Sequence, residues 1–289
     1  MKLYCFYTPS HTALFEDWFG PSVLPEYDLH PLKYHKQLCP SATFRQNGWR
    51  ETQQRKLEYW MQAIEENMGD MIACSDVDAQ FFGQTVAVLT SLLQNKDVLF
   101  QLNTPNRNEG LLCSGFLACQ CNKVTHAFFR CILDGLRKET YIGEQSGINA
   151  LLGGLPHSKQ PHTLYDSTVH GKTDITGTPL SIRWGTIPGH LFWSPMYAYS
   201  RLEEVYIPSS TILFHHATWT HGVDNKIAQL QCVQQAVDQT RTCATRGLFR
   251  KTWTVHRDRV RFMKYMQSLE QDRLPHTANK RRNDTPILK

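Results

Sequence analysis

The chain has 289 residues, more than most single domains and fewer than two full ones, so we expect one large α/β domain with a C-terminal extension. Hydrophobic residues make up 41% and charged residues 20%, which excludes a chain that is disordered throughout. The formal net charge is only +5, and part of it lies in the tail at Lys280-Arg281-Arg282. Without a clustered basic face, this excess does not indicate nucleic-acid binding, although it permits an anionic ligand.

The sequence predicts neither a signal peptide nor a membrane-spanning segment. Met1 to Cys5 lead directly into a strand-like run, without a charged region followed by an apolar core, and nowhere do about 18 apolar residues follow one another. The nine cysteines are scattered and mostly lie in apolar runs, which fits reduced thiols better than a disulfide framework. We therefore expect a cytoplasmic protein with no transmembrane segment.

The first half alternates short apolar runs with segments of helical periodicity. Leu57, Trp60, Met61 and Ile64 recur at helical spacing, which predicts an amphipathic helix within 49–68. Strands alternating with helices of about 10–15 residues imply a mostly parallel central sheet flanked by helices. The expected strands are 3–7, 28–34, 71–74, 98–102 and 111–119, and the further expected helices are 85–93 and 125–136.

The amino-acid composition changes after Gly153, because 154–195 is rich in Gly, Pro, His, Ser and Thr. Such a stretch predicts active-site loops or an irregular subdomain, and we expect acceptor-side loops over 154–200. Order returns with a strand at 212–214 and a helix at 226–239. We expect one domain over 1–240, a C-terminal helical extension over 241–271 and a disordered basic tail over 272–289.

The sharpest motif is Ser75-Asp76-Val77-Asp78, which follows a short apolar run. In extended backbone, Asp76 and Asp78 project to the same side, at the carboxyl end of a strand where open α/β sheets bind ligands. Two close carboxylates repel unless a cation lies between them, and oxygen ligands favour Mg²⁺ or Mn²⁺ completed by substrate phosphates. The alternative is a helix cap at Asp76 and a solvated charge at Asp78.

Three further segments offer side chains or backbone that could bind a metal ion, a phosphate or a sugar. His215 and His216 end a strand, and Gly222 and Lys226 follow, which offers an imidazole ligand, a close backbone approach and a cation for phosphate. Ser114 and Gly115 interrupt an apolar strand, as bulges and ligand contacts do. Glu144 and Gln145 open a predicted helix. For each segment a purely structural role is the alternative: half-buried strand ends, strand irregularity and helix capping.

Taken together and in this order, these segments resemble the nucleotide-diphospho-sugar glycosyltransferases of the GT-A type. The similarity is greatest to the group of nucleotide-sugar transferases related to plant xylosyl- and arabinosyltransferases, and more remote to glycogenin-like enzymes. It extends from about Lys2 to about Leu230 and includes the Thr8 to His11 turn, the aspartate pair and the histidine pair. The resemblance implies a GT-A, Rossmann-like sheet and a glycosyltransferase that moves a hexose or pentose from a nucleotide-sugar donor, a UDP-sugar, to a glycan or glycoside acceptor.

The resemblance also implies a role for individual residues. The metal, Mn²⁺ or Mg²⁺, is held by Asp76, Asp78 and His216, with His215 as the alternative imidazole. Glu144 and Gln145 lie beside the anomeric carbon as the catalytic pair. Relatives mostly retain the anomeric configuration, whereas an inverting enzyme would need a carboxylate base, for which Glu144 or Asp166 is the candidate. The donor-binding residues that it implies are Tyr7, Thr8, Lys56, Asp76, Val77, Ser114, Gly115, Gly222 and Lys226.

Two points stay open at the level of sequence. Aromatic rings stack on sugar faces, so Trp184 and Trp219 are candidates for the acceptor site. For the rings within 154–195, the alternative is a small satellite core. The alternative functions are a metal-dependent sugar-phosphate nucleotidyltransferase, which would also use paired aspartates and a lysine, and a catalytically silent carbohydrate-binding relative. The absence of a Gly-rich phosphate loop containing Lys disfavours the nucleotidyltransferase.

Overall fold

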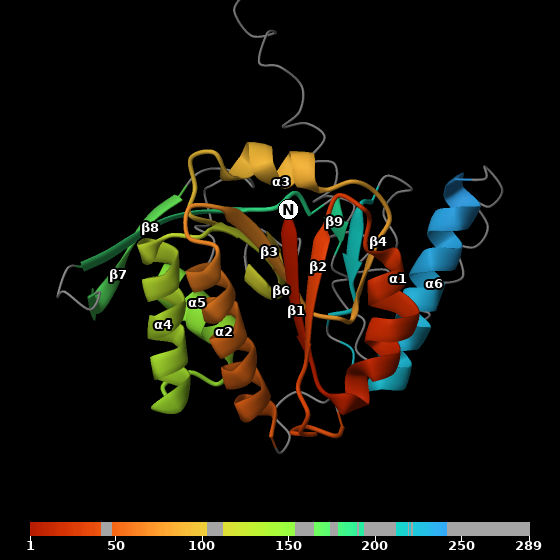
Figure 1. Ribbon diagram of the computed structural model, residues 1–289, viewed down its shortest axis with the longest axis horizontal. Coiled ribbons are helices and arrows are strands. Elements are labelled where there is room, and N and C mark those ends of the chain that lie inside the picture. The colour runs from red at the N-terminus through yellow and green to blue at the C-terminus, as the bar shows by residue number, and fades with distance from the viewer. Residues whose placement is uncertain are drawn as a thin grey trace, which may run out of the picture.

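The computed structural model describes residues 1–41, 48–102, 112–153, 165–173, 179–189, 191–193, 212–218, 220 and 222–241. The central feature is a sheet of seven strands in the order β2-β1-β3-β6-β5-β8-β7 (Figure 1). In the part of the chain that is described, no helix has both the length and the apolar character needed to cross a membrane. The seven strands are β1 (Lys2–Tyr7), β2 (Asp28–Lys33), β3 (Met71–Ser75), β5 (Val98–Leu102), β6 (Leu112–Gln120), β7 (Tyr165–Thr173) and β8 (Pro179–Thr186).

Most of these strands run in one direction. β1 pairs in parallel with β2 and β3, and β5 pairs in parallel with β8. β6 is antiparallel to both β3 and β5, and β7 is antiparallel to β8, so five of the seven strands share an orientation. The prediction of a mostly parallel α/β sheet flanked by helices is therefore confirmed.

Helices cover the two faces of the sheet and enclose two apolar cores (Figure 1). One core lies under α2 (Trp49–Glu66), α4 (Lys123–Arg137) and α5 (Glu144–Leu152). The other lies under the π-helical turn Leu14–Phe19, α3 (Val86–Leu93) and α6 (Val223–Arg241). Side chains along β1 alternate between them, because Tyr4 packs in the first core whereas Leu3 and Cys5 pack in the second, as the two-residue repeat of a strand requires. The short α1 (Gly20–Ser22) continues the π-helical turn.

A small second sheet brings distant parts of the chain together. It has the order β4-β10-β9, formed by β4 (Ala79–Phe81), β10 (Phe214–His216) and β9 (Phe192–Trp193). β10 runs antiparallel to β4, with His216 opposite Ala79, and the backbone N–H of Ala217 donates to the carbonyl of Asp78 at 2.8 Å. This pairing places the end of β10 beside the segment that follows β3.

The interpretation of 154–200 as loops is wrong for two of its segments. Residues 165–173 and 179–186 form β7 and β8 at the edge of the central sheet, because Leu180, Ile182 and Trp184 alternate with exposed residues and face the core. Glu144–Leu152 forms a helix, as expected from its opening residues. The predicted C-terminal extension over 241–271 and the tail over 272–289 lie almost entirely outside the described residues.

Candidate active site

The two aspartates of the Ser75-Asp76-Val77-Asp78 segment lie between β3 and β4, at the carboxyl end of β3. The backbone N–H of Asp76 donates to the carbonyl of Gly115 at 2.8 Å, and the carbonyl of Asp78 accepts from Ala217. Both flanking strands are thus tied to neighbours, β6 on one side and β10 on the other. This edge of the sheet is where open α/β folds bind their ligands.

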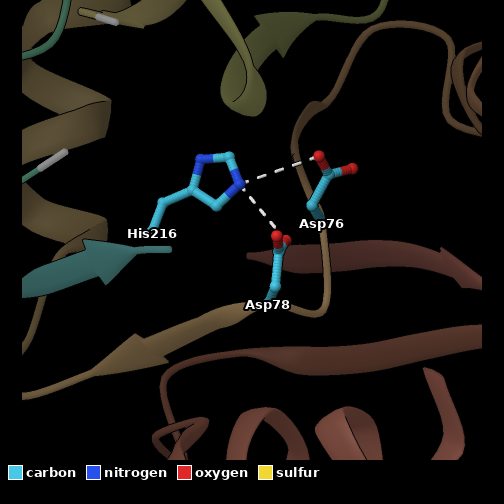
Figure 2. Close-up of side chains that lie close together, drawn as sticks. All are labelled: Asp76, Asp78 and His216. Carbon is cyan, nitrogen blue, oxygen red and sulfur yellow. Dashed lines mark ion pairs between the residues drawn. The ribbon is translucent and has the colours of Figure 1, made fainter. Parts of the chain in front are cut away.

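His216 completes a group of three potential metal ligands (Figure 2). Its Nε2 lies 3.2 Å from Asp78 Oδ1 and 3.8 Å from Asp76 Oδ2, and one ligand atom from each residue lies within 4.8 Å of the others. Among the described residues, this is the only cluster of three or more His, Cys, Asp or Glu side chains with such spacing. Two carboxylates and one imidazole this close together fit a divalent cation.

His215 points to the opposite side of β10 and is fully buried. Its Nε2 lies 3.4 Å from Nε2 of Gln229 on α6, and burial, together with the charge on His216, lowers the pKa of His215 to about 3. Successive side chains of a strand face opposite ways, so only one of the two histidines can reach the aspartates. The structure brings His216 to them.

Two lysines neutralise the carboxylates from opposite directions. Lys226, on the first turn of α6, lies 2.6 Å from Asp78 Oδ2. Lys56, on α2, is only 4% exposed and lies 2.8 Å from Asp76 Oδ1 and 2.6 Å from Glu144 Oε1. Glu144 opens α5, is itself 4% exposed, and accepts a hydrogen bond from Ser114 Oγ at 2.9 Å.

These contacts shift the pKa values of the buried groups. Burial alone would raise the pKa of Asp78, but Lys226 and His216 outweigh it and hold that pKa well below its usual range. Burial alone would lower the pKa of His216, but Asp78 dominates and raises it to about 10. Lys56 likewise has a raised pKa despite burial, because Asp76 and Glu144 face it. At neutral pH the site therefore contains ionised groups of both signs.

A cavity of about 150 Å³ opens beside this network. Several expected donor-binding residues line it: Tyr7, Thr8, Lys56, Asp76, Val77 and Lys226. Ser114 and Gly115 lie behind it, one bonded to Glu144 and the other against His216. Gln145 accepts from the backbone N–H of Ser114 at 3.4 Å. Gly222 precedes α6 with a positive φ of 80°, a conformation that favours glycine.

The two acceptor candidates have different locations. Trp184 is 1% exposed and packs in the core under α2, α4 and α5, so its ring offers no face to a sugar. Trp219 lies outside the described residues. The prediction that Trp184 belongs to the acceptor site is therefore wrong. The ring has a structural role, as the alternative held, but it lies in the main core rather than in a small separate one.

Three site residues escaped the sequence analysis. His11 lines the cavity, the amide of Gln53 lies against the carboxylate of Glu144, and the sulfur of Cys113 lies 3.6 Å from Nδ1 of His216. The helical spacing of Gln53 and Lys56 on α2 and the position of His11 directly after β1 were available signals. No sequence signal marks Cys113, since its contact depends on how β6 and β10 meet.

No protein-family model matches the chain, and no curated protein matches it in sequence. Similar solved structures include a glycosyltransferase involved in glycosylation of the major capsid of PBCV-1, with 12% identity, a TM-score of 0.48, and coverage of 80% of this chain and 98% of that one. The galactosyltransferase LgtC with donor and acceptor sugar analogs shows 13% identity, a TM-score of 0.34, and 54% and 72% coverage. The glycosyltransferase GlyE of Streptococcus pneumoniae TIGR4, in its apo form, shows 9% identity, a TM-score of 0.44, and coverage of 83% of this chain and 63% of that one. All three TM-scores are below 0.5.

Proposed function

We propose that the chain is a metal-dependent glycosyltransferase of the GT-A type, which moves a sugar from a nucleotide diphosphate donor, a UDP-sugar, to a glycan or glycoside acceptor. The observation that carries this proposal is the group of Asp76, Asp78 and His216, with ligand atoms within 4.8 Å of one another, beside a cavity that Lys226 also lines. Paired carboxylates and a lysine that line one cavity, with the imidazole of His216 in contact with the carboxylates, suit a cation with a diphosphate across it.

The ligand set favours Mn²⁺ over Mg²⁺. Mg²⁺ prefers oxygen ligands in near-ideal octahedral geometry, whereas Mn²⁺ accepts an imidazole nitrogen more readily. When bound, such a cation would neutralise the charge that develops on the departing diphosphate. Asp76, Asp78 and His216 would hold it. With these three ligands from the protein, further coordination positions would be open to phosphate oxygens.

The charges of the site support an anionic ligand. Without metal, the positive groups Lys56, Lys226 and His216 face the negative groups Asp76, Asp78 and Glu144, so their charges balance. A dication held by Asp76, Asp78 and His216 would replace the proton on Nε2 of His216, which would leave a net charge of +1. A diphosphate would offset this charge, and Lys226, released from Asp78, would be free to donate to a phosphate oxygen.

Glu144 and Gln145 are proposed to face the anomeric carbon with different tasks. The carboxylate of Glu144 already accepts from Lys56 and Ser114, so it suits positioning better than proton abstraction. Gln145, beside it, would hold the sugar. We propose front-face attack with retention, in which the acceptor oxygen bonds to the anomeric carbon while the bond from that carbon to the departing phosphate oxygen breaks. This phosphate oxygen takes the acceptor's proton.

We further propose that residues 1–240 act as one catalytic domain in the cytoplasm. The support for this compartment is that the eight cysteines among the described residues form no disulfide with one another, and seven of them are buried. Reduced thiols are typical of cytosolic proteins. Trp219, which lies outside the described residues, stays the candidate for stacking on the acceptor.

The decisive experiment is a donor-hydrolysis assay on the full chain. Purified protein is incubated with a panel of UDP- and GDP-hexoses and pentoses, with Mn²⁺ or with EDTA, and nucleotide release is followed by chromatography. We expect release of UDP that requires Mn²⁺. The configuration of the first sugar product, followed by NMR, then tests retention.

Three other outcomes would contradict parts of the proposal. Release of pyrophosphate from a nucleoside triphosphate and a sugar phosphate would identify a nucleotidyltransferase. Sugar binding without turnover of any donor would identify a silent carbohydrate-binding relative. Release of UDP that is equally fast in EDTA would remove the metal from the mechanism.

A further inference from the structure

The sulfur of Cys113 lies against the side of His216 that faces away from the aspartates. Cys113 is in β6 and is 1% exposed. Its Sγ is 3.6 Å from Nδ1 of His216 and accepts the backbone N–H of Gly115 at 3.4 Å. The cysteine is therefore fixed by its own strand and touches the imidazole directly.

The two nitrogens of the His216 ring face different partners. Nε2 points to Asp78 and Asp76, at 3.2 and 3.8 Å, whereas Nδ1 faces Cys113. An imidazole that binds a metal through the lone pair of Nε2 carries its proton on Nδ1. Since His216 is 4% exposed, that N–H needs an acceptor inside the protein, and metal-binding histidines usually have one.

We propose that Cys113 is a positioning residue for the metal site: its sulfur accepts the Nδ1–H of His216 and so keeps the Nε2 lone pair directed at Asp76 and Asp78. This inference rests on the metal in the proposed function. It deepens that function by naming a residue that acts on the cation only through another side chain, since Cys113 itself does not reach the cavity.

Four other buried cysteines do not share this arrangement. Cys74, Cys119, Cys121 and Cys131 pack with apolar side chains in the core under α2, α4 and α5. Cys113 instead lies in a part of β6 where its register with β5 shifts, between Phe100 and Gln101. Such bulges redirect side chains next to active sites. A thiol is also a weak acceptor compared with the carboxylates that more often support metal-bound histidines, so this bond orients the ring without strongly raising its basicity.

The test is the affinity of the full chain for Mn²⁺ alone, measured by titration calorimetry. Removing a residue that orients a metal ligand typically weakens binding about 10- to 100-fold, and we expect Cys113→Ala to fall in this range. Cys113→Ser keeps a hydrogen-bond acceptor at this position and should restore part of the loss. Cys119→Ala is the matched control, because Cys119 is equally buried on the same strand and does not touch the site. It should bind Mn²⁺ like the wild type, even where thermal unfolding shows a similar loss of stability.

Each remaining outcome would overturn the inference. Wild-type affinity in Cys113→Ala would refute the positioning role and leave the proposed function intact. Equal losses in Cys113→Ala and Cys119→Ala would assign the effect to core packing. A wild-type protein that does not bind Mn²⁺ would remove the metal from the proposed function and this inference with it.

Discussion

Gly115 lies directly against the imidazole of His216. A methyl group built on Gly115 would be 1.8 Å from Cε1 and 2.3 Å from Nδ1 of the ring, closer than any non-bonded atoms come. The two residues are about a hundred positions apart, on β6 and β10. Because only glycine leaves room for the ring, the place of His216 beside Asp76 and Asp78 depends on the absence of a side chain at position 115.

Gly115→Ala is therefore expected to displace His216 from the aspartates. We expect about a 10- to 100-fold loss of Mn²⁺ affinity, the range for residues that orient metal ligands, measured by calorimetry. Gly185→Ala is the matched control, since Gly185 lies on β8, which carries none of the three proposed ligands, and its new methyl group would meet the flexible side chain of Lys96 at 2.6 Å. It should lower stability without altering Mn²⁺ affinity. Unchanged affinity in Gly115→Ala would show that the imidazole is not a ligand.

Asp78→Asn tests the carboxylate that faces both Lys226 and His216. Two unit charges about 4 Å apart interact by ~4 kcal/mol at an effective dielectric of about 20, and about 1.4 kcal/mol corresponds to a tenfold change in affinity. We expect Mn²⁺ affinity to fall at least about 100-fold, with donor hydrolysis lost. In the control Asp97→Asn, a buried aspartate that accepts from the backbone N–H of Arg183, stability should fall while Mn²⁺ affinity stays. Equal affinities in Asp78→Asn and the wild type would contradict the metal assignment.

Much of this architecture could be predicted from sequence, since the expected strands and helices of the first half match the observed ones within a few residues. The pair Asp76 and Asp78 was found because it follows an apolar run with two-residue spacing. β8 was missed although Leu180, Ile182 and Trp184 alternate, because the surrounding Gly, Pro and Ser indicated loops. The contact of Cys113 with His216 could not be predicted, since it depends on a register shift and on the pairing of β4 with β10.

Lys56 is enclosed between Asp76 and Glu144, so Lys56→Met leaves the buried carboxylate of Glu144 and the partly exposed carboxylate of Asp76 without this cation. Breaking a buried ion pair from one side typically costs about 3–5 kcal/mol, and we expect a loss of this order in the free energy of unfolding, measured in urea. Adding Glu144→Gln removes one of the two uncompensated charges. The double variant should therefore lose less stability than the sum of the losses in Lys56→Met and Glu144→Gln, with a coupling energy of about 0.5–3 kcal/mol, the usual range for contacting residues. Additive losses would show that Lys56 and Glu144 do not interact.

The pH dependence of stability reports on His11, at the mouth of the cavity. Burial, helped by Lys226, lowers the pKa of His11 to about 4 from its usual 6.5. Between these values the unfolded chain binds the proton more readily, so the native state loses stability as pH falls, by up to about 1.4 kcal/mol for each pH unit. His11→Gln removes this contribution to the pH dependence of stability. We expect its destabilisation relative to the wild type, measured by urea unfolding in EDTA, to shrink by about 2 kcal/mol between pH 7 and pH 5. His215, buried in both proteins, contributes equally and cancels, so a difference that does not change with pH would refute the depressed pKa of His11.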